Sequence, residues 1–377
     1  MSTVEPAVPP HLDLAFFHRL LDVDERDPAV ELLSKAREVS RGLGYLVMAA
    51  AARDGVVGTG SADELRRMRL RLDFYAEVLR HCRPLGARAV KGPALAVWYP
   101  ADLPRPMNDL DLVVPDEAAL WRTVGAVIDA FGPRTMDVTV FGGEPRHFLV
   151  ALAWPGLDPL LDHDLRVEIC TCAFTGDHAA VPMRALLPED EVAAGLLGVA
   201  EERFQRPFNA KDAADVIMAL APGRPVDPAL IVESAERWRL APELLELLLH
   251  TRAHSDHLDH LDHGLLDGLA LAARREQGRR EAWSRDHGAT EDATGPIGSE
   301  VASALRAQGT PVFGMQLTEL ERGTRPRRDP AAAVVHHFDG GALLRTPAAD
   351  FLLVLDALVD QDLYDRGMAA LRDLDAV

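Results

Sequence analysis

Residues 108–114, NDLDLVV, decide the fold of the region around them. Apolar and acidic side chains alternate here, which predicts a strand, because successive side chains of a strand point to opposite faces. Leu110 and Leu112 then face a core, while Asp109 and Asp111 project together on the other side. Two carboxylates on one face repel each other unless a cation lies between them, and Mg²⁺ prefers such oxygen ligands. The stretch predicts a metal-binding strand, with a solvated strand edge as the alternative.

Further short apolar runs on either side of this strand predict a sheet. They are ARAVKG (87–92), MDVTVFGG (136–143), HFLVALAW (147–154) and LRVEICTC (165–172). Residues 118–132, between two of these runs, have helical spacing instead. The pattern predicts an α+β core over residues 83–185, with a mixed sheet and flanking helices.

The remainder of the chain divides by its periodicity. Residues 1–82 form a helical segment, and residues 186–270 a helical domain. Residues 271–300 are charged and then rich in Gly, Thr and Pro, which favours a linker. In 301–377 two strands, 311–317 and 333–344, precede an apolar helix over 349–364. This small C-terminal α/β segment carries no motif that indicates a role.

The charge of the chain narrows the range of partners. Asp and Glu total 59 against 40 Lys and Arg, a formal charge of -19. Proteins that bind long nucleic acid gather basic residues, so this excess argues against such a partner. No apolar run is long enough to span a membrane, and the first residues lack the features of a signal peptide. We expect a cytoplasmic protein with no membrane partner.

Glu168 is the candidate for a third carboxylate. It lies in the run LRVEI (165–169), where the flanking apolar residues face the core and Glu168 faces the opposite side. It would serve as third metal ligand or as general base. The alternative is an ion pair with Arg166. Upstream, Lys91 offers a point charge for phosphates, and Gly92 allows close approach of the backbone.

The order Lys-Gly, Tyr99, Arg105 and then D-x-D-L-V resembles the bacterial nucleotidyltransferase family that carries this pattern, a branch of the nucleotidyltransferase superfold. The resemblance covers roughly residues 70 to 250. It includes a later strand of the type h-[DE]-h, matched by 167–169, and a helical motif that residues 211–215 resemble. Pro93 departs from the superfold, because proline removes one backbone N–H that could bind phosphate.

The resemblance implies roles for individual residues. Asp109, Asp111 and Glu168 would be the catalytic carboxylates and the Mg²⁺ ligands. The nucleotide-binding residues would be Lys91, Gly92, Arg105 and Lys211. For Arg105 the alternative is an ion pair with one of the two aspartates. For Lys211 it is an i,i+4 pair with Asp215 on a helix surface.

The expected function is therefore that of a Mg²⁺-dependent nucleotidyltransferase. It would move a nucleoside monophosphate from an NTP, with ATP among the candidates, to a hydroxyl of a small molecule or peptide. One alternative is a non-catalytic or antitoxin-like nucleotide-binding module that acts through a protein partner. Another is a phosphotransferase, since the same carboxylates can support transfer of a γ-phosphoryl group.

Overall fold

The computed structural model describes residues 11–224, 226–259, 263–287, 297–320, 329–356 and 358–376. The chain forms two compact units. Unit 1 contains Met1–Phe74, Val90–Asn108 and Leu187–Asp286, and unit 2 contains Tyr75–Ala89, Asp109–Leu186 and His287–Val377. Neither unit is one continuous stretch, so the five consecutive regions expected from the sequence do not correspond to them. Within the described ranges, no helix is both long and apolar enough to cross a membrane.

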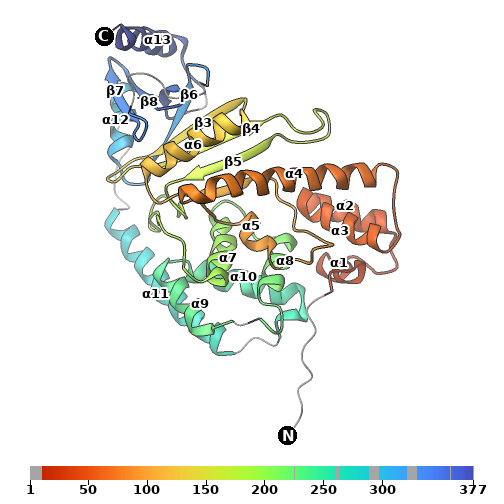
Figure 1. The fold of residues 1–377 in the computed structure, drawn as a ribbon. Coiled ribbons are helices and arrows are strands. Elements are labelled where there is room, and N and C mark those ends of the chain that lie inside the picture. The colour runs from red at the N-terminus through yellow and green to blue at the C-terminus, as the bar shows by residue number, and fades with distance from the viewer. Residues whose placement is uncertain are drawn as a thin grey trace. The chain divides into compact units, whose positions relative to one another are not determined.

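Unit 1 is built from helices, in agreement with the helical periodicity of its longer stretches (Figure 1). Several of its helices begin at side chains that accept backbone hydrogen bonds, among them Ser40 before α3 and Asn209 before α8. Its helices are α1 (Leu14–Leu20), α2 (Ala29–Val39), α3 (Arg41–Arg53), the first part of α4 (Ser61–Cys82), α5 (Gly92–Ala96), α7 (Glu191–Glu201), α8 (Ala210–Ala219), α9 (Pro228–Arg237), α10 (Ala241–His254) and α11 (His263–His287).

Of the stretch 271–300, expected to be a linker or exposed segment, the residues as far as His287 continue α11. Several of its charged side chains form ion pairs. Buried Glu276 pairs with Arg239 at 3.1 Å, and Arg280 pairs with Glu243 at 2.6 Å. Residues 288–296 lie outside the described residues. The composition of this stretch was therefore a poor guide to its conformation.

Unit 2 contains a nine-stranded sheet in the order β1-β2-β5-β4-β3-β6-β9-β8-β7. The pair β2–β5 is parallel and the other neighbouring pairs are antiparallel, which confirms the predicted mixed sheet in an α+β fold. Its strands are β1 (Arg88–Ala89), β2 (Leu110–Val113), β3 (Thr135–Phe141), β4 (His147–Trp154), β5 (Leu165–Cys170), β6 (Pro311–Gln316), β7 (Val334–Phe338), β8 (Gly341–Arg345) and β9 (Asp350–Val354).

Helix α6 (Glu117–Phe131) covers one face of this sheet (Figure 1). The ring of Trp121 meets that of Phe148 on β4 at 5.8 Å, edge to face. On the same face Val150 and Leu152 of β4 lie beside apolar residues of β5. Because side chains alternate along each strand, the residues between them point to the opposite face.

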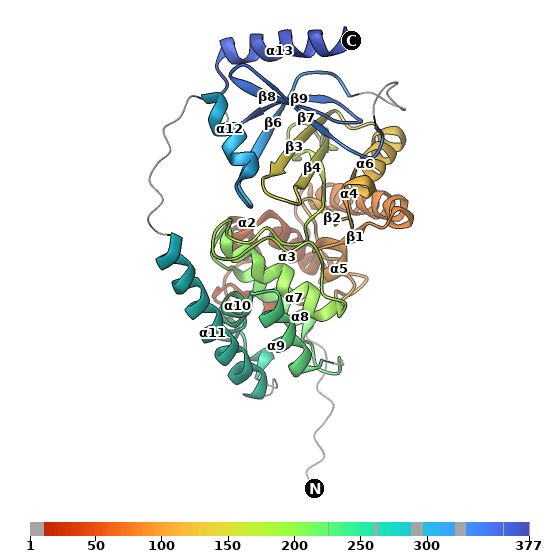
Figure 2. The same ribbon diagram turned by 90° about the vertical axis from the view of Figure 1, so that its left-hand side faces the viewer.

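The predicted helix over 349–364 is wrong for most of its length, because residues 350–354 form strand β9 and the helix begins only at Gln361. Every residue of β9 is buried, and it lies between β6 and β8 in the sheet. Apart from Asp350, β9 is a short apolar run, and such a run fits a buried strand and a buried helix equally well, which explains the error. The helix, α13 (Gln361–Asp375), begins later and packs through Leu371 on Leu343 and Leu352 (Figure 2).

The C-terminal strands are part of the central sheet, because β6 pairs with β3. The chain also passes closely over this region at Gly142, which follows β3. A Cβ at Gly142 would stand 2.1 Å from the carbonyl oxygen of Ala304 on α12 (Ile297–Arg306). The C-terminal segment, whose role was open from the sequence, thus completes the sheet of unit 2.

Candidate functional site

Asp111 and Glu168 lie directly opposite each other on the neighbouring parallel strands β2 and β5. Paired residues of adjacent strands point to the same face, about 4.8 Å apart. That face is the one turned away from α6, because Leu110 and Leu112 are fully buried on the other side. Both acidic residues are half-buried. The sheet therefore brings together two of the three carboxylates predicted from the sequence.

Asp109 immediately precedes β2 and is exposed. Two positions before Asp111, it belongs to the same side of the extended chain. Over the ranges that the structure describes, no cluster of three or more His, Cys, Asp and Glu side chains is arranged to hold a metal ion. The geometry thus brings two carboxylates together and leaves the third outside the group.

Arg166 binds one of these carboxylates. Its Nε donates to Glu168 Oε1 at 2.7 Å, and the Arg166 side chain is 46% exposed. This is the alternative that the sequence left open for Glu168. Ion pairs with so exposed a partner contribute little free energy because water screens them. Glu168 can therefore exchange Arg166 for another cation at small cost.

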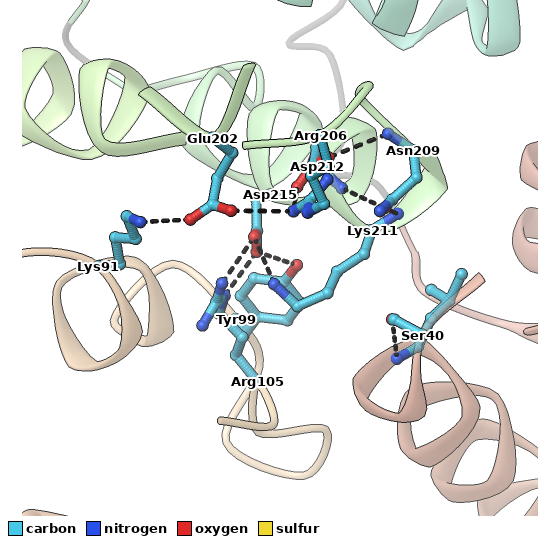
Figure 3. Close-up of polar contacts among 11 residues, drawn as sticks. Ser40, Lys91, Tyr99, Arg105, Glu202, Arg206, Asn209, Lys211, Asp212 and Asp215 are labelled. Atoms are coloured by element: carbon cyan, nitrogen blue, oxygen red, sulfur yellow. Dashed lines mark hydrogen bonds and ion pairs between the residues drawn. The ribbon is translucent and has the colours of Figure 1, made fainter. Parts of the chain in front are cut away.

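The residues that the resemblance assigned to the nucleotide, Lys91, Gly92, Arg105 and Lys211, all belong to unit 1. There each of the three cations binds a carboxylate (Figure 3). Arg105 makes a two-bonded contact with Asp215, with Nε to Oδ1 at 2.6 Å and Nη2 to Oδ2 at 2.7 Å. The partner of Arg105 is thus on α8, and it is neither of the two aspartates considered from the sequence.

Asp215 also binds Tyr99 and Lys211 (Figure 3). The Tyr99 hydroxyl donates to Oδ1 at 2.8 Å, and Lys211 Nζ to Oδ2 at 3.3 Å. Burial alone would raise the pKa of Asp215, but Arg105 and Lys211 hold it well below its usual value. Burial raises the pKa of Tyr99, and burial, with Arg105 nearby, lowers that of Lys211. The charged carboxylate of Asp215 therefore holds the segment that carries Tyr99 and Arg105 in place through hydrogen bonds.

A second group of ions lies next to the first. Lys91 binds Glu202, whose second oxygen lies 3.5 Å from Arg206, and Arg206 binds Asp212 at 2.6 Å. Burial would raise the pKa of Glu202, but Lys91 lowers it. Asp212 in turn accepts the backbone N–H of Asn209, which completes a capping box at the start of α8. Lys91 is thus bound to Glu202, which directly follows α7, and Arg105 is bound to Asp215 on α8.

Sequence reasoning placed Lys211 and Asp215 on a helix surface, whereas Asp215 is 1% exposed. A signal was present in the sequence. Asp215 interrupts an otherwise apolar run, AADVIMALA (213–221). An acidic residue within an apolar helical run is expected to be buried with a partner, because an unpaired buried charge is very costly.

A scan against models of protein families finds no match to this chain, and neither do searches of curated proteins and of solved structures.

Proposed function

We propose that this protein is a Mg²⁺-dependent nucleotidyltransferase whose metal-binding carboxylates lie on β2 and β5 of unit 2. The observation that carries the proposal is the direct register of Asp111 with Glu168 on the face of the sheet turned away from α6. Asp109, which stands outside this pair, is not required for it, since Mg²⁺ is bound in proteins through one or two carboxylates. The acceptor would be a hydroxyl of a small molecule or peptide, and the donor an NTP.

The donor set fits the ion. Magnesium is bound in proteins through one or two carboxylates, with water and substrate phosphates filling the other positions. Asp111 and Glu168 would hold it, and Glu168 would first release Arg166. When bound, such an ion neutralises charge on the transferred phosphoryl group. Glu168 is also the candidate to accept the proton of the attacking hydroxyl, since a general base must lie within hydrogen-bond reach of it.

A second candidate function is a non-catalytic nucleotide-binding module. The ion pair between Arg166 and Glu168 favours it, because this pair satisfies the carboxylate without a metal. The phosphotransferase alternative uses the same residues, and the mass of the product separates it from nucleotidyl transfer.

Calorimetry with each NTP, with and without Mg²⁺, tests the proposal. We expect one NTP to bind only with Mg²⁺, and binding to be lost in Asp111→Asn and in Glu168→Gln. The matched control is Asp137→Asn, because Asp137 is an exposed carboxylate of β3 that lies opposite Ala151, the β4 neighbour of Glu168. Absence of NTP binding in the unaltered protein, or equal loss in the control, would refute the metal site. Binding without turnover of any acceptor would favour the binding module.

A further inference from the structure

Strand β7 stands at the end of the sheet order, so β8 is its neighbour on one side and no described strand pairs with its other side. Its sequence is VVHHF. Natural edge strands are commonly protected by lysine, by proline or by a bulge. β7 contains neither lysine nor proline, and no bulge interrupts its register with β8 from Val334 to Phe338. The edge is therefore suited to pairing with another strand.

The hairpin determines which backbone groups point outward. Asp339 and Gly340 form a two-residue turn, with Phe338 opposite Gly341. The residues that flank such a turn form a hydrogen-bonded pair, and hydrogen-bonded and non-hydrogen-bonded pairs alternate beyond it. The N–H and C=O groups of Val335 and His337 consequently point away from β8.

At the start of β7, one outward backbone N–H is already engaged in a hydrogen bond within the same chain. Ala333, the next outward residue before Val335, donates its N–H to Glu117 Oε1 at 2.7 Å. A partner strand can therefore pair along Val335 and His337 and must end near Ala333. A strand that turns back after a few residues meets this condition, and β7 itself is such a strand because its hairpin turn follows Phe338.

We propose that β7 pairs in antiparallel orientation with β7 of a second copy of this chain, about a two-fold axis at His336. In this register Val335 lies opposite His337 of the other copy, and each such pair exchanges two backbone hydrogen bonds. On one face Val334, 48% exposed, lies opposite Phe338 of the other copy. Pairs of a β-branched and an aromatic side chain stabilise antiparallel strands.

The register is self-complementary, which is what a two-fold interface requires. The residues that precede β7, 331–333, are alanines, and they come opposite the hairpin turn of the other copy, so no large side chain obstructs it. Asp339 of one copy approaches the Glu117 that holds Ala333 of the other, so the association should weaken as the salt concentration falls.

Cross-linking of the full-length His336→Cys variant tests the register. Directly opposed residues of a non-hydrogen-bonded antiparallel pair have Cα atoms about 4.5 Å apart, a separation that a disulfide can bridge. We expect a covalent dimer on mild oxidation at pH 8 and 0.15 M salt. His337→Cys is the matched control, since it lies opposite Val335 and should give no more dimer than the unaltered chain with its own three cysteines. Equal cross-linking of both variants, or none of His336→Cys, would overturn the proposal.

Sedimentation velocity tests the association without an added cysteine. The unaltered protein should show a sedimentation coefficient that rises with concentration toward that of a dimer. Val335→Pro removes an outward N–H and leaves the bonds to β8, so it should remain a monomer. Val335→Thr keeps both the N–H and the branched side chain and should behave as the unaltered protein does. A monomer at every concentration, or dimers that survive Val335→Pro, would refute pairing through β7.

Discussion

Arg105 donates to both carboxylate oxygens of Asp215, at 2.6 and 2.7 Å, although the two residues are 110 positions apart in the chain. Their side chains are 7% and 1% exposed. Planar two-bonded contacts of this kind are the strongest class of ion pair, and their partners depend on each other when both are buried. The contact fastens the loop that follows α5 to α8.

The substitution Asp215→Ala should strongly destabilise unit 1. It leaves the buried Arg105 without its partner carboxylate, and removal of one member of a buried pair costs about 3–5 kcal/mol. The urea midpoint, followed by circular dichroism, measures the effect. Asp24→Asn is the control, because Asp24 also binds an arginine, Arg26, through two contacts but at the surface. Equal losses in the two variants would contradict a special role for burial.

The contribution of Asp215 should depend on pH in a definite direction. Its pKa in the folded protein is depressed, so the ion pair stabilises the fold fully above the unfolded pKa of about 3.9 and is lost as the pH falls toward the folded value. The difference in urea midpoint between the unaltered protein and Asp215→Asn should be constant from pH 7 to pH 5 and shrink below pH 4. A difference that shrinks already between pH 7 and pH 5 would contradict the depressed pKa.

Two glycine substitutions in unit 2 should have opposite effects. Gly142→Ala places a Cβ 2.1 Å from the Ala304 carbonyl oxygen and 2.5 Å from that of Ala307, so α12 must move. Gly125→Ala, in α6, meets no atom within 4 Å. It should stabilise the protein by about 0.5–1 kcal/mol, because alanine favours a helix over glycine. Thermal unfolding of both variants measures this, and a neutral Gly142→Ala would show that the close approach is not rigid.

The ion pair between Arg166 and Glu168 should compete with Mg²⁺ if the proposed metal site is correct. Arg166→Ala should tighten Mg²⁺ binding by up to about fivefold, because an exposed pair is worth roughly 0.2–1 kcal/mol. Isothermal titration with Mg²⁺ alone provides the measurement. Arg146→Ala, at an exposed arginine between β3 and β4, is the control. Unchanged affinity in Arg166→Ala would place the ion elsewhere or nowhere on this face.

The fold could be predicted where the pattern of side chains is periodic. Alternation along 108–114 and 165–169 placed Asp111 and Glu168 on strands with their carboxylates opposite the core, and the structure confirms this. The pattern failed at β9, where Asp350 is followed by four apolar residues and no period is visible. It also did not show that α11 continues to His287, where Arg275, Glu276 and Arg280 pair with residues of α9, α10 and the turn between them.

The candidate site was harder to predict, because it depends on contacts between distant parts of the chain. The sequence shows that Asp111 and Glu168 each face away from a core, but it does not show that β2 and β5 are neighbours. In the same way, the charges of Arg105 and Lys211 suggested a phosphate site, whereas both side chains bind Asp215. For Arg105 this partner lies in a distant segment of the chain. For Lys211 it lies on the same helix, on a face whose burial the sequence reasoning did not recognise.

The pairing of β3 with β6 has a consequence for folding during synthesis. The edge of β3 that faces β6 is covered only after Pro311, the partner of Phe141, has been synthesised. At a translation rate of about 5–20 residues per second the edge stays open for roughly 10 to 30 seconds. Throughout that interval the nascent chain exposes the edge of β3, with its alternating apolar residues, to other chains. We therefore expect the nascent chain to depend on a chaperone more than the folded protein does.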